Sequence, residues 1–167
     1  VMRRSMLRQE QNVRRFWREV RGLMLHRHPG LAQLVDAGRT QDGRLFLATD
    51  FVPGRDVFGI IQRGRALPYG LWLNLADQLL RAVGSAHELQ DPSGARLGLV
   101  HRDLKPENVM VDWDGRVVVL DFGLAQARAE PTATRITRPG QVMGTPKYMA
   151  PEQIVEPEAV GPRTDQY

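Results

Sequence analysis

The chain has 167 residues, of which 42% are hydrophobic and 25% charged, a balance typical of a single soluble domain rather than of a disordered chain. No apolar run approaches the roughly 20 residues that cross a bilayer, and the lack of cysteine excludes disulfides and thiolate chemistry. The net charge is +4, and 21 of the 23 basic residues are arginine. A compositional bias explains this excess better than a nucleic-acid surface, because no aromatic stacking platform accompanies the arginines.

The beginning of the chain is predicted to form one helix and a hairpin. Apolar residues recur at helical spacing, with arginines on the opposite face, which predicts an amphipathic helix over about 9–25. Two strands are predicted near 31–37 and 45–51. The turn-forming sequence Thr-Gln-Asp-Gly at 40–43 would join them.

The middle of the chain is predicted to be helical. A short helix is expected near 56–63, after a Pro-Gly pair, and a long helix near 69–88. The polar stretch 90–98, which contains Gly and Pro, then predicts a loop. The buried face of the long helix is expected to consist of Leu71, Leu75, Leu79, Ala82, Val83 and Ala86.

The pattern changes from helical to strand-like in the second half. Runs of β-branched residues at 109–111 and 117–120 flank the sequence Asp-Trp-Asp-Gly at 112–115, which predicts a β-hairpin. Residues 124–146 are rich in Thr, Arg, Pro and Gly and are expected to form a loop. Helices combined with small hairpins in this order predict an α+β fold.

Three short motifs follow one another in this half: HRDLKPEN at 101–108, DFG at 121–123 and APE at 150–152. In this order and spacing they resemble the motifs of protein kinases. The stretch GTPKYMAPE at 144–152 resembles the Ser/Thr branch, and residues 16–38 are similar to the regulatory helix and following strand of bacterial eukaryotic-like (Hanks-type) kinases. The resemblance covers essentially the whole chain.

The resemblance implies an incomplete form of the two-lobe protein kinase fold. Residues 1–52 would be the remainder of the small lobe and the hinge, and residues 53–167 the first part of the large lobe. The chain shows no Gly-rich phosphate loop, and neither Lys105 nor Lys147 occupies the place of the strand lysine. We therefore expect the 167 residues alone to be poorly stable and to have negligible kinase activity, and the parent protein to be active.

The resemblance also implies a catalytic role for four residues around the second hairpin. Phosphoryl transfer passes through a loose transition state, so that the enzyme mainly positions groups and neutralises charge. Asp103 would accept a hydrogen bond from the substrate hydroxyl, and Lys105 would offset the charge of the transferred group. Asn108 and Asp121 would supply hard oxygen ligands for Mg²⁺ on the phosphates of ATP. Alone, an Asp or Asn at a strand end is commonly a turn cap.

Further residues are assigned to the nucleotide by the resemblance. Thr49 would occupy the gatekeeper position, and backbone groups of Asp50 and Val52 would face the purine. Met110 would form part of the apolar floor below it. Glu19 resembles the helix glutamate that pairs with the strand lysine and thereby helps to hold the phosphates.

Regulatory residues are implied in the same way. Arg102 resembles the arginine that pairs with a phosphate on the activation loop, and Thr145 would hydrogen-bond near the catalytic aspartate. His101 is expected to be a buried residue that braces the loop. The candidate phosphorylation sites are Thr132, Thr134 and Thr137.

Two other function classes stay open at this stage. A pseudokinase scaffold would have no physical need for both expected metal ligands, and a small-molecule kinase of the aminoglycoside phosphotransferase type would have no need for the peptide-docking stretch at 144–152. The expected partner is a protein that offers Ser or Thr hydroxyls, without nucleic acid. A cytoplasmic location is expected, and the sequence leaves membrane association of the parent protein open.

Overall fold

The computed structural model describes most of the chain after its first 16 residues. The described residues are 17, 20–24, 26–43, 45–64, 67–91, 93–122, 146–156 and 159–167. Within the helix predicted over 9–25, Trp17 and residues 20–24 are helical, and the remainder lies outside the described residues. The loop predicted at 124–146 also lies outside them, except for its last residue.

The first hairpin consists of β1 (Leu34–Arg39) and β2 (Leu45–Thr49), which pair antiparallel. The predicted turn between them is confirmed: Gly43 has a φ of 82°, and its N–H donates to the carbonyl of Thr40 at 2.8 Å. The prediction that the first strand begins at 31 was wrong. The backbone around Leu31 pairs with Val119 instead, and this contact joins the hairpin region to the second sheet.

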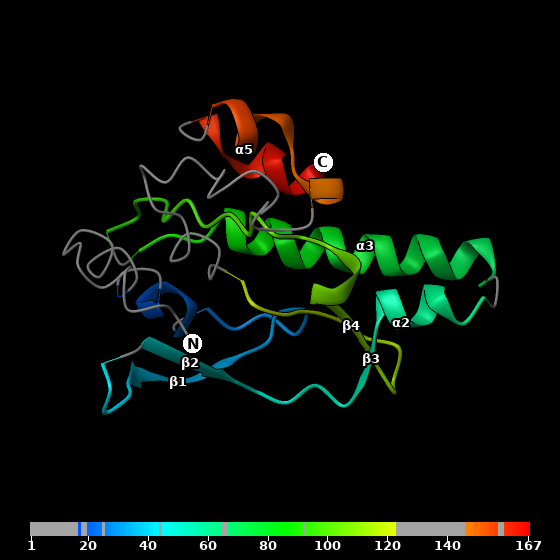
Figure 1. The fold of residues 1–167 in the computed structure, drawn as a ribbon, viewed down its shortest axis with the longest axis horizontal. Coiled ribbons are helices and arrows are strands. Elements are labelled where there is room, and N and C mark those ends of the chain that lie inside the picture. Colours follow the sequence, from blue (N-terminus) through cyan, green and yellow to red (C-terminus); the bar gives the residue numbers. More distant parts are fainter. Residues whose placement is uncertain are drawn as a thin grey trace.

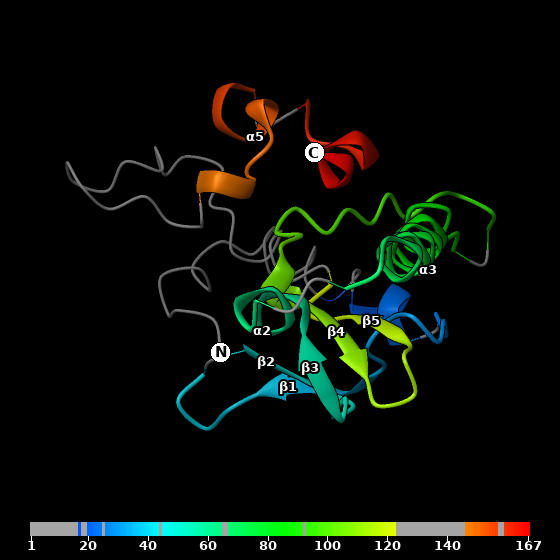
Figure 2. The ribbon, with the colours of Figure 1, turned by 90° about the vertical axis from the view of Figure 1, so that its right-hand side faces the viewer.

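The second sheet has three antiparallel strands in the order β3-β4-β5, seen side by side in Figure 2. The strands are β3 (Gly54–Asp56), β4 (Val109–Asp112) and β5 (Val117–Val119). The predicted hairpin is therefore confirmed, whereas β3 was not predicted, because three residues are too few to show an alternating pattern. Gly54 allows β3 to approach β4 closely, since a Cβ there would lie 2.2 Å from the carbonyl oxygen of Val111.

Two helices pack beside the second sheet, and two shorter ones lie near the end of the chain. The short helix α2 (Val57–Gln62) begins at Asp56, whose carboxylate accepts a hydrogen bond from the Gly59 N–H at 2.7 Å. The long helix α3 (Tyr69–His87) agrees with the prediction to within one residue. The chain ends with α5 (Pro151–Val155) and a 3-10 helix at Pro162–Gln166, which lie on the side of α3 away from the first hairpin (Figure 1).

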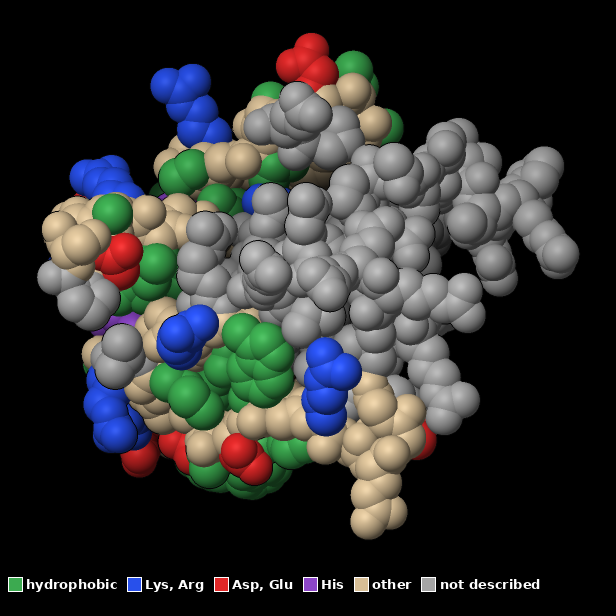
Figure 3. Space-filling model, turned by 90° about the vertical axis from the view of Figure 1, so that its left-hand side faces the viewer, with side chains coloured by type: hydrophobic (Ala, Val, Ile, Leu, Met, Phe, Trp, Pro, Cys, Tyr) green, Lys and Arg blue, Asp and Glu red, His purple; other side chains and the backbone are tan. Residues whose placement is uncertain are grey.

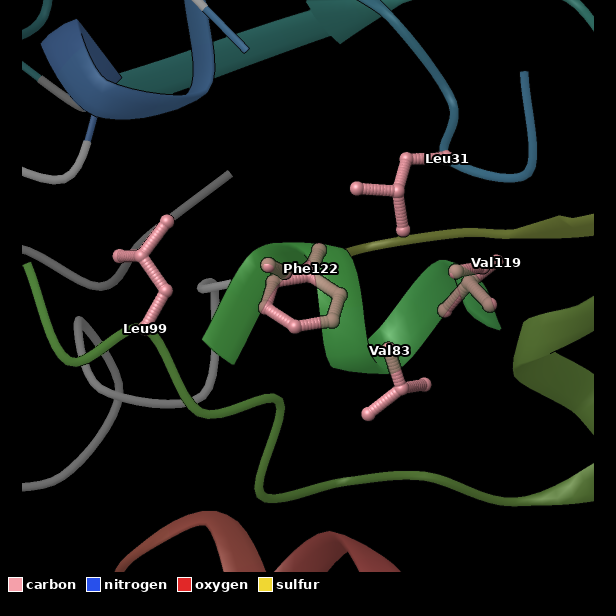
Figure 4. Packing of buried hydrophobic residues seen from close by; sticks show 7 residues of the cluster. Leu31, Val83, Leu99, Val119 and Phe122 are labelled. Carbon is pink, nitrogen blue, oxygen red and sulfur yellow. The ribbon is translucent and has the colours of Figure 1, made fainter. Parts of the chain in front are cut away.

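The main core lies between the C-terminal half of α3, β5 and the loops beside them. It is formed by Leu31, Ala82, Val83, Ala86, Leu99, Val119 and Phe122 (Figure 4). Three of the six α3 residues that were predicted to be buried belong to it, and Leu79 packs against it. The prediction was wrong for Leu71, which is 51% exposed, because the described core reaches only the C-terminal half of the helix.

Several large hydrophobic side chains remain on the surface of the described part of the chain. Figure 3 shows hydrophobic side chains gathered on one face between separate Lys and Arg side chains. The most exposed of these residues are Phe51, Tyr69, Val155, Tyr167 and Trp113. None of the helices that the structure describes combines the length and the apolar character needed to cross a bilayer. Two small sheets with helices packed around them confirm the α+β prediction.

Candidate active site

The candidate site is built where the loop before β4 meets the end of β5. The loop continues into a 3-10 turn at Pro106–Asn108, whose last residue enters β4. The Leu120 N–H donates to the carbonyl of Asn108 at 2.8 Å, which ties the end of β5 to this turn. Asp121 therefore follows directly at the same edge of the sheet, and the local hairpin brings residues 13 positions apart together.

Three of the predicted catalytic side chains contact one another. The Lys105 ammonium lies 3.1 Å from Oδ2 of Asp103. The amide nitrogen of Asn108 donates to the backbone carbonyl of Asp103 at 2.7 Å and approaches its Oδ2 at 3.3 Å. Because the nitrogen of the amide is directed at Asp103, its oxygen is the atom that can accept a cation. The exposed carboxylate of Asp121 follows at the same sheet edge, and both oxygens are hard ligands of the kind that Mg²⁺ prefers.

His101 braces this loop from within, as predicted. Its side chain is fully buried, and Nε2 lies 2.9 Å from the carbonyl oxygen of Leu120. A carbonyl only accepts, so Nε2 carries the proton and Nδ1 is free to accept the Asp103 N–H at 3.3 Å. The ring also meets Phe122 edge-on, with the ring centres 5.1 Å apart.

Arg102 holds an unusual backbone conformation directly before Asp103. Its φ is 66°, in the left-handed region, which costs roughly 1–2 kcal/mol for a residue with a Cβ. The carboxylate of Asp165 secures this turn, because Oδ1 accepts the Arg102 N–H and Oδ2 accepts the His101 N–H, both at 2.8 Å. His87 of α3 also contacts Oδ2, at 2.8 Å. Three chain segments thus meet at one buried carboxylate: α3, the loop at 101–102 and the 3-10 helix that carries Asp165.

Three of the residues predicted to bind the nucleotide line two separate cavities. Thr49 lines a small cavity of about 50 Å³ together with Asp121 and Phe122. Asp50 and Val52 line a larger cavity of about 520 Å³. The structure therefore brings Thr49 to the candidate metal ligand but does not place Asp50 and Val52 on that cavity.

Asp50 and Met110, both predicted to face the nucleotide, can also be placed in the structure. The Asp50 N–H donates to the carbonyl of Gln33 at 2.9 Å, so that of its two backbone groups only the carbonyl could serve the purine prediction. Met110 is half-buried in β4, opposite Val118 of β5, a position compatible with an apolar floor.

Comparison with known proteins assigns the family. A model described as a protein kinase domain matches residues 1–167. The chain belongs to the protein kinase family. It is 39% identical over 158 residues to serine/threonine-protein kinase pkn3 of Myxococcus xanthus, which covers 92% of this chain and 27% of the relative. It is 35% identical over 159 residues to serine/threonine-protein kinase PknA of Mycobacterium tuberculosis, which covers 93% of this chain and 34% of the relative.

Solved structures agree with this assignment. The crystal structure of the Mycobacterium tuberculosis PknI kinase domain matches with a TM-score of 0.70 and 30% sequence identity, over 100% of this chain and 57% of that chain. The expected kinase-like fold and the bacterial Hanks-type Ser/Thr branch are confirmed. The chain spans about a third or less of the length of the curated relatives named above.

Several predicted kinase residues lie outside the described residues. They are Glu19, Thr132, Thr134, Thr137 and Thr145, and the same holds for the glycine of the DFG motif. Arg102, the predicted phosphate partner, is described, and its backbone is anchored as shown above. The roles of these residues stay predictions.

The sequence analysis missed the residues that anchor the kinase loop from a distance. Gln153 and Asp165 bond to the loop across 51 to 64 positions of the chain, and His87 contacts Asp165 across 78 positions. No periodic pattern marks such contacts, because each joins two irregular segments. Of the three, only Asp165 carried a signal in the sequence, since it resembles the aspartate that opens the central helix of the large lobe in kinases.

The end of the described chain is tied back to the APE motif. The Thr164 hydroxyl donates to Oε1 of Glu152 at 2.7 Å, and this hydrogen bond lowers the pKa of the Glu152 carboxyl. The Gly161 N–H donates to the same hydroxyl at 3.2 Å. Thr164 thus joins α5 to the 3-10 helix that carries Asp165.

Proposed function

We propose that the natural protein transfers the γ-phosphoryl group of ATP to Ser or Thr hydroxyls of protein substrates. The observation that supports this most is the contact of Asp103 with both Lys105 and Asn108. A scaffold gains nothing from a carboxylate, an ammonium and an amide held together at a half-exposed loop. A phosphotransferase needs all three, because its transition state requires orientation and charge neutralisation.

In this proposal Asp103 accepts a hydrogen bond from the substrate hydroxyl and orients it toward the phosphorus atom. Aspartate is a weak base with an ordinary pKa of about 3.9, so it takes the proton late, once the new bond has formed. Lys105, 3.1 Å from the same carboxylate, is placed to neutralise charge on the transferred group. Holding both groups in advance removes the entropic cost of bringing them together.

Asn108 and Asp121 would hold Mg²⁺, which would neutralise charge on the phosphates when bound. The described residues fit this role by their chemistry, because they offer one amide oxygen and one carboxylate at the same sheet edge, and Mg²⁺ prefers hard oxygen ligands. The nucleotide would contact Thr49, backbone groups of Asp50 and Val52, and Met110. Glu19 would help to hold its phosphates.

Regulation would act through the segment between the DFG and APE motifs. Arg102 would pair with a phosphate on one of the threonines there, Thr132, Thr134 or Thr137, and Thr145 would hydrogen-bond near the catalytic aspartate. A kinase of this kind draws on ATP, which places the catalytic domain on the cytoplasmic side of the cell.

The experiment compares the full-length natural protein with three variants, Asp103→Asn, Asn108→Ala and Asp121→Asn. The matched control is Asp114→Asn, which makes the same change at a carboxylate 87% exposed on the turn of the same hairpin. Transfer of labelled phosphate from ATP to protein Ser or Thr is measured with Mg²⁺ present. We expect the three site variants to lose at least about 10²-fold in kcat and the control to keep wild-type activity.

The two other function classes have distinct outcomes in the same experiment. A pseudokinase would bind a nucleotide without transferring phosphate to any acceptor. A small-molecule kinase would phosphorylate an aminoglycoside and leave protein acceptors unlabelled. Either result, or full activity in Asp103→Asn, would contradict the proposed function.

A further inference from the structure

Gln153 joins the segment after the activation loop to the catalytic loop. It lies in α5 and is 6% exposed. Its side-chain oxygen accepts the Ala150 N–H at 3.0 Å, and its side-chain nitrogen donates to the carbonyl of Arg102 at 2.7 Å. One amide group therefore uses its acceptor within the APE region and its donor on the residue before Asp103.

The peptide unit between Arg102 and Asp103 is held at both of its polar atoms. Its carbonyl oxygen accepts from Gln153, and its N–H donates to Nδ1 of His101 at 3.3 Å. The N–H before it is held by Asp165 at 2.8 Å. Rotation of this peptide unit would move the Cα of Asp103 and change the direction of its carboxylate.

The restraint matters because Arg102 has a φ of 66°. A residue with a Cβ prefers a negative φ, so the backbone here keeps its conformation only while its surroundings enforce it. His101 and Asp165 restrain the N–H groups of this turn, and Gln153 restrains the carbonyl. Of these restraints, the hydrogen bond from Gln153 is the one that comes directly from α5.

We propose that Gln153 is a positioning residue for phosphoryl transfer, which fixes the Arg102–Asp103 peptide unit and couples the placement of α5 to the aim of the Asp103 carboxylate. This inference rests on the proposed kinase activity. It adds a conformational input to that activity, because any change that withdraws α5 also releases the carbonyl of Arg102. Gln153 would then affect phosphoryl transfer at Asp103 without contacting the substrate.

The decisive variant is Gln153→Glu in the full-length protein. The new side chain has nearly the same size and can still accept the Ala150 N–H, but above its pKa it presents an oxygen to the carbonyl of Arg102. We expect kcat to fall on the order of 10- to 100-fold at about pH 8, with the KM for ATP within about twofold of wild type. The matched control is Gln166→Glu, the same change at an exposed position.

The pH profile separates positioning from general disruption. Burial raises the pKa of an introduced carboxyl, and the protonated form regains an O–H that can donate to Arg102. The ratio of variant to wild-type kcat should therefore rise as the pH falls from about 8 to about 6. Gln153→Met, which has no donor at any pH, should lose activity and show no such rise.

A second readout does not depend on catalysis. Hydrogen exchange followed by mass spectrometry reports the protection of the backbone amides over 101–105. In Gln153→Met we expect exchange in this peptide to be faster by at least about tenfold, with the melting temperature and the exchange of β4 close to wild type. This measurement holds even if Gln153→Glu fails to fold at neutral pH.

The possible results distinguish failure of the Gln153 proposal from failure of the proposed function. An active wild type with unchanged kcat in Gln153→Glu, a loss that does not depend on pH, or unchanged exchange over 101–105 in Gln153→Met would overturn the positioning role and leave the proposed function standing. A wild type that transfers no phosphate to protein would overturn the proposed function and the role of Gln153 in it. Loss with recovery at lower pH supports both.

Discussion

Replacing Asp165 by Asn tests the anchoring of the catalytic loop directly. Oδ2 of Asp165 serves two donors, His87 and the His101 N–H, whereas Oδ1 serves the Arg102 N–H, each at 2.8 Å. An amide offers one oxygen only. In its better orientation the oxygen keeps the first two contacts, and the NH₂ group faces the Arg102 N–H, so that one hydrogen bond is lost and two donors oppose each other.

The expected cost follows from the number and type of these hydrogen bonds. A hydrogen bond to a charged acceptor contributes about 1.5–3 kcal/mol, and the two that remain weaken because the acceptor is now neutral. Burying an amide is less costly than burying a carboxylate, which offsets part of the loss. We therefore expect Asp165→Asn to lower the free energy of unfolding by about 2–4 kcal/mol and to reduce kinase activity through the displaced Arg102 turn.

The assay is urea denaturation followed by tryptophan fluorescence, with kinase activity measured on the same samples. Asp114→Asn is the matched control, since its carboxylate is 87% exposed and the same change there should alter the free energy of unfolding by less than about 0.5 kcal/mol. A loss below about 0.5 kcal/mol in Asp165→Asn, with activity retained, would refute the view that this buried carboxylate holds the loop.

Two further predictions concern the scaffold. Gly54→Ala would place a Cβ 2.2 Å from the carbonyl oxygen of Val111, so we expect β3 to shift and the free energy of unfolding to fall by about 1–3 kcal/mol. Gly84→Ala, where a Cβ meets no atom within 4 Å, should instead stabilise α3 by about 0.5–1 kcal/mol. Equal effects of the two changes on the free energy of unfolding would contradict this reasoning. Burial lowers the pKa of His26 below 6.5, so protonation favours the unfolded chain. The stability that neutral His26 contributes is complete above pH 6.5 and is lost as the pH falls through the pKa of the folded state. In urea melts between about pH 7.5 and about pH 5, the free energy of unfolding should decline less steeply for His26→Gln, which can still bond to Ser85. Identical slopes for the variant and the wild type would exclude His26 as a source of the pH dependence.

The parts of the fold that were predicted correctly are those that local chemistry determines. The long helix α3 and the hairpin of β4 and β5 follow from apolar spacing and from the turn at 112–115, which involve only near neighbours in the chain. The contacts of Asp103 with Lys105 and Asn108 join residues at most five positions apart, within one motif. The pairs that form these features are therefore visible in a short stretch of sequence.

The parts that were missed depend on distant segments. The strand β3 exists because Gly54 fits against β4, and neither its length nor its composition indicates a strand. The backbone of Leu31 pairs with Val119, 88 positions later in the chain, and so does not extend β1. The exposure of Leu71 reflects where the described core ends, which an amphipathic pattern alone does not reveal. In each case tertiary contacts decided between structures that the local sequence allows equally.

The distribution of backbone strain supports an enzyme rather than a scaffold. Among the residues that the structure describes, Arg102 and Asp121 are the non-glycine residues with positive φ, at 66° and 54°. Each lies at the proposed catalytic centre, one directly before Asp103 and the other at the proposed metal site. A scaffold that only binds a partner could relax both positions or replace them with glycine at no cost to binding. The strain at Arg102, which Asp165 and Gln153 hold in place, and the strain at Asp121 are better explained by chemistry that needs the side chains in these directions.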